Sequence, residues 1–172
     1  MNTVKNIFVV DDDQTQAMML QDYLSKYSTF TIHTFNSGEE CIKNLSLKPD
    51  IIFLDYNFDK VGKDAMNGIE ILREIKSANP STEVVMFSGQ DRIEVAVNSM
   101  KYGAFDYIVK NESAFHRSEN VIFNIIKRLK LQYQASLYKK LTIFLGITLL
   151  LVIILVVVLY QSGVISKNPG WM

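Results

Sequence analysis

The feature that most constrains this chain is a run of twenty residues near its C-terminus. Residues 141–160, LTIFLGITLLLVIILVVVLY, contain no charged side chain. A helix of this length rises about 30 Å, which matches the hydrocarbon thickness of a bilayer. A buried helix of a water-soluble domain is normally amphipathic, whereas this run is apolar on every side. It therefore predicts a single transmembrane helix, with the rest of the chain folding outside the bilayer.

The charges that flank this run predict its orientation. Five basic residues precede it within 127–140, and one, Lys167, follows it. Because basic flanks stay on the cytoplasmic side, we expect the N-terminal body in the cytoplasm and residues 161–172 as a short tail on the other side. The prediction is a single-pass protein of the inner (cytoplasmic) membrane, in which residues 131–140 form a basic juxtamembrane helix near anionic lipid.

Charge also separates the body from this basic segment. Residues 1–112 hold 11 Lys/Arg and 17 Asp/Glu, a net charge of −6, whereas residues 113–140 hold 6 and 1, a net charge of +5. An acidic body argues against a nucleic-acid partner. The apolar fraction of 48% allows a packed core, and the single cysteine, Cys41, cannot form an internal disulfide. A long helix that leads into the membrane leaves a homodimer possible through coiled-coil pairing.

The body, residues 1–130, alternates short apolar runs with segments of helical spacing. The predicted strands are Lys5–Val10, Phe30–Phe35, Ile51–Leu54, Glu83–Phe87 and Asp106–Val109. Helical spacing follows each of them, as at Ile69, Leu72 and Ile75. Five repeats of strand and helix predict an α/β fold with a parallel sheet covered by helices on both faces.

Polar side chains stand at the ends of four predicted strands. Asp11 and Asp12 end the first, Asp55 the third, Ser88 the fourth and Lys110 the fifth. Ligands of such sheets bind beyond the carboxyl ends of the strands, so we expect these side chains to converge. Three carboxylates repel one another unless a cation is present, and oxygen ligands favour Mg²⁺ or Mn²⁺. The lysine and the serine would then complete a cradle for a phosphoryl group on a nucleophilic carboxylate.

Four segments resemble the receiver domain of two-component response regulators. They are IFVVDDD, DIIFLD, VVMFSG and GAFDYIVK, in this order, and the similarity extends over roughly residues 4–130. The resemblance implies a flavodoxin-like fold with a five-stranded parallel sheet. It also implies that the chain accepts a phosphoryl group from a histidine kinase or phosphotransfer protein and signals to an unknown downstream protein through its surface. No enzymatic activity is implied beyond self-catalysed aspartyl phosphorylation and dephosphorylation.

The resemblance also implies a role for individual residues of the metal and acceptor site. Asp11 and Asp12 would bind magnesium, Asp55 would accept the phosphoryl group and also contact the metal, and a carbonyl at Asn57 would complete the metal site.

Three further residues match the conserved lysine and the switch pair of receivers. Lys110 would contact the phosphoryl group. Ser88 and Tyr107 would change conformation together when the phosphoryl group is bound.

The sequence departs from the receiver pattern in three places. The segment 56–67 is long, Asn111 replaces the usual proline after the lysine, and we expect no DNA-binding or enzymatic output domain after the receiver-like part. The expected organisation is a receiver domain at 1–130, a juxtamembrane helix at 131–140, a transmembrane helix at 141–160 and a tail at 161–172.

Two other functions are compatible with parts of the sequence. One is a pseudo-receiver that acts as an adaptor without being phosphorylated. The other is a phosphatase similar to haloacid dehalogenases, in which Asp11, Asp13 and Thr15 would form the DxDxT motif and Asp11 would be the nucleophile. The phosphatase leaves Asp55 without a role, so labelling of Asp55 rather than Asp11 separates it from a receiver.

Overall fold

The structure is a computed structural model that describes residues 6–58 and 66–162. The chain divides into two compact units, Met1–Arg128 and Leu129–Met172. The N-terminal unit holds all the strands and all helices but the last, α5 (Ala114–Gln161), whose residues belong to both units.

The N-terminal unit is built on a five-stranded sheet in which every strand pairing is parallel. The strand order is β2-β1-β3-β4-β5. The predicted α/β fold is confirmed. The strands are β1 (Asn6–Val10), β2 (Thr31–Phe35), β3 (Ile51–Leu54), β4 (Glu83–Ser88) and β5 (Asp106–Val109).

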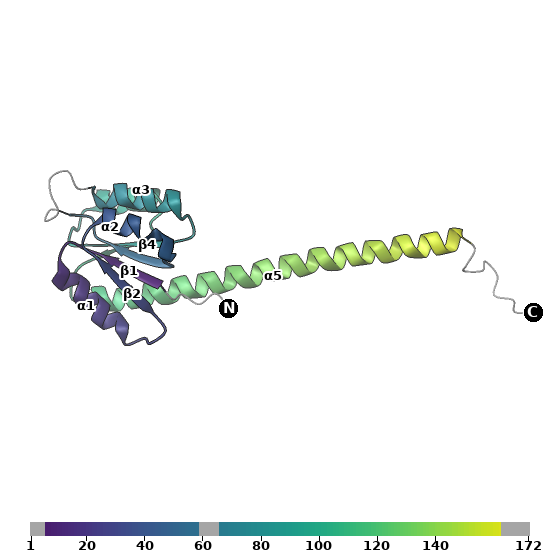
Figure 1. Ribbon diagram of the computed structural model, residues 1–172, viewed down its shortest axis with the longest axis horizontal. Helices are drawn as coiled ribbons and strands as arrows, with labels where there is room; N and C mark the ends of the chain where they lie inside the picture. The colour runs from purple at the N-terminus through teal and green to yellow at the C-terminus, as the bar shows by residue number, and fades with distance from the viewer. Residues whose placement is uncertain (1–5, 59–65, 163–172) are drawn as a thin grey trace, which may run out of the picture. The chain divides into compact units, whose positions relative to one another are not determined.

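Helices cover both faces of the sheet, as expected for parallel strands joined by crossovers. In Figure 1, α1 and the first turns of α5 lie on one side of the sheet, and α2 and α3 lie on the other. The helices that precede α5 are α1 (Gln14–Ser25), α2 (Gly38–Lys43), α3 (Gly68–Ala78) and α4 (Ile93–Lys101), with a short 3-10 turn at Leu45–Leu47.

Successive residues of the central strands point to opposite faces, so each strand contributes to two apolar layers. Phe8, Ile52 and Met86 belong to a buried cluster that also includes side chains of α2 and α3. The alternate strand residues, such as Ile7 and Phe53, are equally buried. Because both faces are buried, the strands read as continuous apolar runs in the sequence.

A half-buried carboxylate joins the end of α1 to the beginning of α5. Glu119 accepts hydrogen bonds from the Tyr23 hydroxyl (2.7 Å), the Lys26 ammonium (3.0 Å) and the Tyr27 hydroxyl. These donors, first of all Tyr27, lower the pKa of Glu119 to about 2. The Tyr23 ring also stacks on Phe115, with 5.5 Å between the ring centroids. The part of α5 that belongs to the N-terminal unit is thus bound to it by polar and aromatic contacts.

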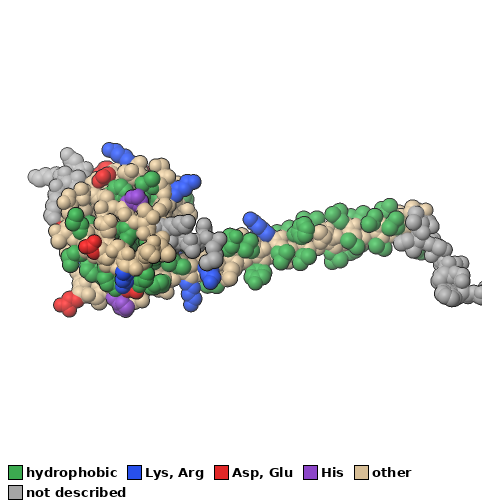
Figure 2. Space-filling view, turned by 60° about the horizontal axis from the view of Figure 1, so that its bottom comes forward, with side chains coloured by type: hydrophobic (Ala, Val, Ile, Leu, Met, Phe, Trp, Pro, Cys, Tyr) green, Lys and Arg blue, Asp and Glu red, His purple; other side chains and the backbone are tan. Residues whose placement is uncertain are grey.

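The C-terminal unit contains the rest of α5. Among the described residues, α5 is the one helix long and apolar enough to cross a membrane, and its most apolar stretch is not buried. Figure 2 shows hydrophobic side chains along the face of this unit that is in view.

Gly68 offers a test of the packing between α3 and the end of β3. A Cβ at this position would lie 2.4 Å from the Asp55 carbonyl oxygen and 2.7 Å from the Tyr56 Cα. Because both atoms are backbone, we expect Gly68→Ala to lower the free energy of unfolding by roughly 1–3 kcal/mol. Urea unfolding of a fragment of residues 1–140 measures this.

Gly89→Ala is the matched control, since no heavy atom lies within 4 Å of its added Cβ. An equal loss of stability in both variants would contradict the close contact at Gly68.

Candidate functional site

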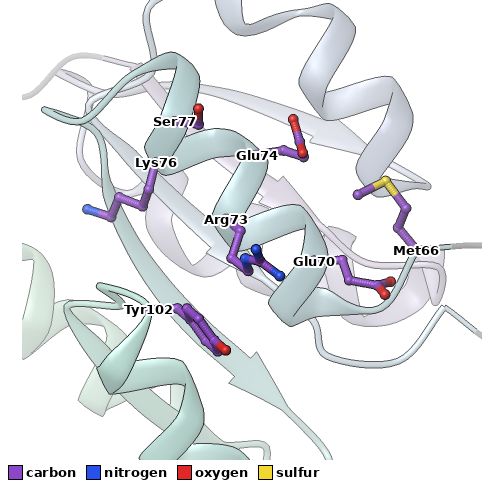
Figure 3. Close-up of a pocket in the computed structure, with 7 residues that line it drawn as sticks. All are labelled: Met66, Glu70, Arg73, Glu74, Lys76, Ser77 and Tyr102. Atoms are coloured by element: carbon purple, nitrogen blue, oxygen red, sulfur yellow. The ribbon is translucent and has the colours of Figure 1, made fainter.

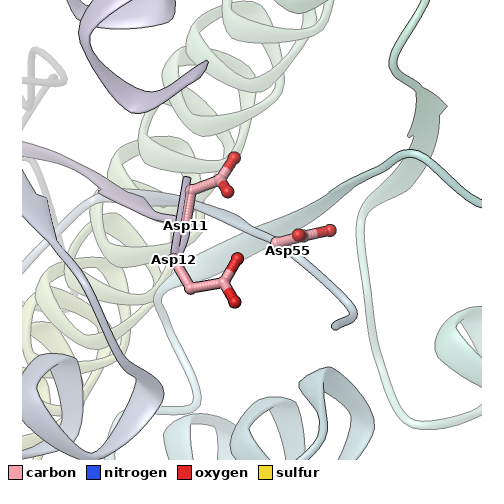
Figure 4. A group of neighbouring side chains, drawn as sticks. All are labelled: Asp11, Asp12 and Asp55. Carbon is pink, nitrogen blue, oxygen red and sulfur yellow. The ribbon is translucent and has the colours of Figure 1, made fainter. Parts of the chain in front are cut away.

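The ends of β1 and β3 bring three carboxylates together. Asp11 and Asp12 follow β1 and Asp55 follows β3, and the last residues of these strands, Val10 and Leu54, are paired in the sheet. One oxygen of each carboxylate lies within 4.8 Å of the others. Figure 4 shows the three side chains at the same edge of the sheet. The predicted convergence of these carboxylates is therefore found.

Backbone hydrogen bonds hold the two buried carboxylates in place. The Asp55 N–H donates to the Val10 carbonyl at 2.9 Å, which continues the ladder between β1 and β3 past the end of the strands. The Asp55 Oδ1 accepts from the Tyr56 N–H at 2.7 Å, and the Asp11 Oδ1 accepts from the Asp13 N–H at 3.0 Å. One oxygen of each carboxylate is thereby oriented by the main chain.

Lys110 supplies the positive charge opposite these carboxylates. Its Nζ lies 2.6 Å from the Asp11 Oδ2 and 3.2 Å from the Asp55 Oδ2. Lys110 follows β5, and its backbone N–H donates to the Ser88 carbonyl at 2.8 Å. This hydrogen bond continues the ladder between β4 and β5 and fixes the position of the Lys110 backbone. One ammonium therefore bridges both buried acids.

Burial makes these carboxylates costly to ionise. Asp11 is 2% and Asp55 is 7% exposed. Burial raises the pKa of both carboxyl groups above the ordinary value, and the nearby Lys110 ammonium offsets part of that increase. A further cation at the site would favour the ionised forms in the same way.

The donor set fits a divalent hard cation. Asp11, Asp12 and Asp55 present three carboxylate oxygens close together, and oxygen ligands are those that Mg²⁺ prefers. Asn57 is half-buried and lies two residues after Asp55, in the loop that follows β3. A role for its carbonyl in the metal site stays a prediction.

Ser88 and Tyr107, the predicted switch pair, are connected through the backbone of one residue. The Gln90 N–H donates to the Ser88 Oγ at 3.3 Å, and the Gln90 carbonyl accepts from the Tyr107 hydroxyl at 2.7 Å. Ser88 is buried at the end of β4, and Tyr107 is half-buried on the neighbouring strand. Burial raises the pKa of the Tyr107 hydroxyl, which favours the neutral, hydrogen-bonding form.

The third aspartate of the motif after β1 does not face the site. Asp13 caps α1, because its Oδ1 accepts from the N–H groups of Thr15 at 3.0 Å and Gln16 at 3.3 Å. The DxDxT interpretation requires Asp13 in catalysis, whereas this carboxylate is used in a helix cap.

Two departures from the receiver pattern lie beside the site. The Asn111 side chain accepts from both the N–H and the hydroxyl of Ser113, at 3.0 and 2.9 Å, which forms the turn before α5. Among the described residues no peptide bond is cis, so the bond from Lys110 to Asn111 is trans. Of the long segment 56–67, residues 59–65 lie outside the described residues.

The sequence did not indicate the aromatic surface beneath Lys110. The Phe87 ring centroid lies 5.7 Å from the Lys110 Nζ, and Phe87 stacks in turn on Phe115 of α5. In the sequence, Phe87 is one of several apolar residues of a buried strand. Its position directly before Ser88 is the signal that would place it next to the site.

A hollow of the N-terminal unit that includes none of the acidic-edge residues lies along α3. It measures about 740 Å³ and is bordered by α3 and by the end of α4, where the Arg73 guanidinium lies 5.3 Å from the centroid of the Tyr102 ring. Figure 3 shows acidic and basic side chains of α3 around it. Its mixed charges do not select one ligand class, so the carboxylate edge remains the candidate site.

Comparisons with known proteins agree with this arrangement. The family model described as "Response regulator receiver domain" matches residues 7–118. Over 107 residues the chain is 31% identical to the chemotaxis protein CheY of Thermotoga maritima, which covers 62% of this chain and 85% of that protein. The other curated relatives are longer, and the chain spans 21–38% of their length.

Solved structures show the same architecture. The receiver domain of NtrX from Brucella abortus superposes with a TM-score of 0.62 at 28% identity, over 70% of this chain and 98% of that one. The CheX-CheY-BeF3-Mg²⁺ complex from Borrelia burgdorferi matches with a TM-score of 0.61 at 25% identity, over 70% of this chain and 88% of that one. The chain therefore belongs to the response regulator receiver domain family.

Proposed function

We propose that this protein is a membrane-tethered receiver that is phosphorylated on Asp55. The observation that carries the proposal is the Lys110 ammonium, which bridges two buried carboxylates at 2.6 and 3.2 Å. Ser88 ends the neighbouring strand β4. Receiver domains interact with histidine kinases or phosphotransfer proteins. A protein of this class is the proposed phosphoryl donor.

The transfer needs a nucleophile, a positive charge and a donor for the oxygens of the incoming group. The Asp55 Oδ2 attacks phosphorus, the bond between phosphorus and the donor's imidazole nitrogen breaks, and an acyl phosphate forms. Lys110 offsets the added negative charge, and the Ser88 hydroxyl donates to one phosphoryl oxygen. The Tyr56 N–H keeps the other Asp55 oxygen oriented at 2.7 Å.

Receiver domains bind Mg²⁺ at an acidic pocket, and here that pocket consists of Asp11, Asp12 and Asp55. We propose that the Asn57 carbonyl is a fourth ligand and that Mn²⁺ can replace Mg²⁺, because both cations prefer oxygen ligands. When bound, the ion neutralises charge on the phosphoryl oxygens. The protein residues position it and exclude competing anions through their own negative charge.

Intact mass of the fragment of residues 1–140 tests the acceptor. After incubation with Mg²⁺ and acetyl phosphate, we expect one phosphoryl group on the wild type and none on Asp55→Asn. Chelation of the metal should also abolish the addition, since the carboxylate oxygens then lack their counter-ion.

A different nucleophile or an adaptor function would give other results in this experiment. Equal addition to both proteins would identify a different nucleophile, with Asp11 the next to be replaced. A folded wild type that gains no mass would favour the adaptor function.

The signal leaves the site through the pair Ser88 and Tyr107. When Ser88 turns toward a phosphoryl oxygen, its Oγ leaves the Gln90 N–H, which weakens the segment whose carbonyl holds the Tyr107 hydroxyl. Tyr107 then moves into the space vacated by Ser88, and the surface formed by α4 and β5 changes shape for a downstream partner.

Backbone NMR of the same fragment tests this switch. Phosphorylation should shift the amide resonances of α4 and β5 in the wild type, whereas Ser88→Ala should be phosphorylated with much smaller shifts there. Shifts of equal size in Ser88→Ala would contradict a route through Ser88.

We also propose that residues 141–160 anchor the receiver, with residues 1–130 in the cytoplasm and 131–140 as the juxtamembrane helix. The apolar stretch of α5 and the excess of basic residues before it support this orientation. An anchor raises the effective concentration of the receiver near membrane-bound kinases or targets. Pairing of two chains through the exposed part of α5 is an additional possibility within this proposal.

Alkaline extraction of membranes tests the anchor. The full chain should stay in the membrane pellet, because an apolar run of this length loses its burial when it leaves lipid. Deletion of residues 141–172 removes this run and should release the protein. The released fragment should still be phosphorylated, which controls for folding. A deletion variant that remains in the pellet would contradict an anchor at 141–160.

A further inference from the structure

A groove on the C-terminal unit combines polar and apolar side chains. It measures about 650 Å³ and lies entirely on α5, within the unit Leu129–Met172. Its polar side chains belong to residues 134–140, and its apolar side chains extend to residue 144. The lining residues are Gln134, Leu137, Tyr138, Lys140, Leu141 and Phe144.

Helical spacing explains why these side chains share one face. Residues three or four apart lie one above the other, so Gln134, Leu137, Leu141 and Phe144 form a row along the helix. Lys130 stands four residues before Gln134 and continues this row at its polar end. The face therefore changes from basic and polar to wholly apolar over about three turns.

The change from polar to apolar side chains on this face coincides with the start of the apolar run at residue 141. If residues 141–160 span the bilayer, as proposed above, the groove lies where headgroups meet acyl chains. The aromatic rings in it are unprotected by protein: Tyr138 is 70% and Phe144 is 62% exposed. An amphiphile that is polar at one end and apolar at the other would cover both parts of the groove.

The charge of the groove selects an anionic amphiphile. Lys140 is a cation, Tyr138 and Gln134 carry hydrogen-bond donors, and residues 120–172 contain no Asp or Glu that would repel an anion. We propose that the groove binds the headgroup of one anionic phospholipid through Lys140, with an acyl chain along Leu141 and Phe144 on the same side of the helix. This inference rests on the proposed anchor and adds a lipid site to it.

A bound lipid differs from diffuse attraction between a basic segment and an anionic surface. Diffuse attraction depends on the number of lysines near the surface and not on which side of the helix they occupy. Lys139 and Lys140 are neighbours in sequence and lie at nearly the same depth. They are about 100° apart around the helix, and Lys139 does not line the groove. Substitution of each lysine in turn therefore distinguishes a lipid-binding site from diffuse attraction.

The experiment uses the full chain in phosphatidylcholine vesicles that contain spin-labelled phosphatidylglycerol or spin-labelled phosphatidylcholine. The immobilised fraction of each labelled lipid gives their relative affinity. We expect the wild type to prefer phosphatidylglycerol by about fivefold, the effect of one lysine near a headgroup. Lys140→Gln should abolish most of this preference, and Lys139→Gln should retain it.

Alkaline extraction of the same vesicles distinguishes failure of the site from failure of the anchor. A chain that is extracted from the vesicles would refute both proposals. A chain that stays in the vesicles but shows no preference for phosphatidylglycerol would refute the lipid site alone. An equal loss of preference in Lys139→Gln and Lys140→Gln would also refute the site and leave only diffuse attraction.

Discussion

The rest of the N-terminal unit depends on the contact of one ammonium with two buried carboxylates. Asp11 and Asp55 leave water at the ends of adjacent strands, and neither would be stable as an anion there without Lys110. Lys110 reaches them because of the strand order, in which one strand, β4, lies between β5 and β3. The parallel topology is what allows residues 99 positions apart in sequence to form a hydrogen bond at 2.6 Å.

The fold could be predicted from the sequence because each element follows from a local rule. Continuous apolar runs indicated strands buried on both faces, and the observed β2 begins one residue later than expected. The convergence of Asp11, Asp12, Asp55 and Lys110 also followed from their positions at the carboxyl ends of parallel strands. The contacts that depend on side-chain packing could not be predicted in this way. Only its position directly before Ser88 separates Phe87 from the other apolar residues of its strand, and the Gln90 carbonyl that holds Tyr107 is a backbone atom.

The side chains of α5 lie in two different environments. Near its beginning, Val121, Ile122 and Ile125 are buried in the N-terminal unit, and Glu119 accepts hydrogen bonds from three donors at the end of α1 and just after it. From residue 130 onward its described side chains are almost all exposed, although many of them are apolar. One continuous helix thus contributes a layer to the N-terminal unit and, farther along, an exposed apolar surface for which the proposed anchor supplies lipid as the partner.

Three identical residues in a row after β1 are not interchangeable. Asp11 is a buried anion matched to Lys110, Asp12 faces the metal pocket, and Asp13 caps the first turn of α1 with a carboxylate oxygen. The cap itself requires an acceptor oxygen and no charge, so serine, threonine and asparagine also suit it, whereas an amide at position 11 would leave Lys110 without its nearer counter-ion. Sequence variation in related chains should therefore be read position by position: another capping residue at the third position preserves the start of α1, whereas loss of the acid at the first position removes the counter-ion of Lys110.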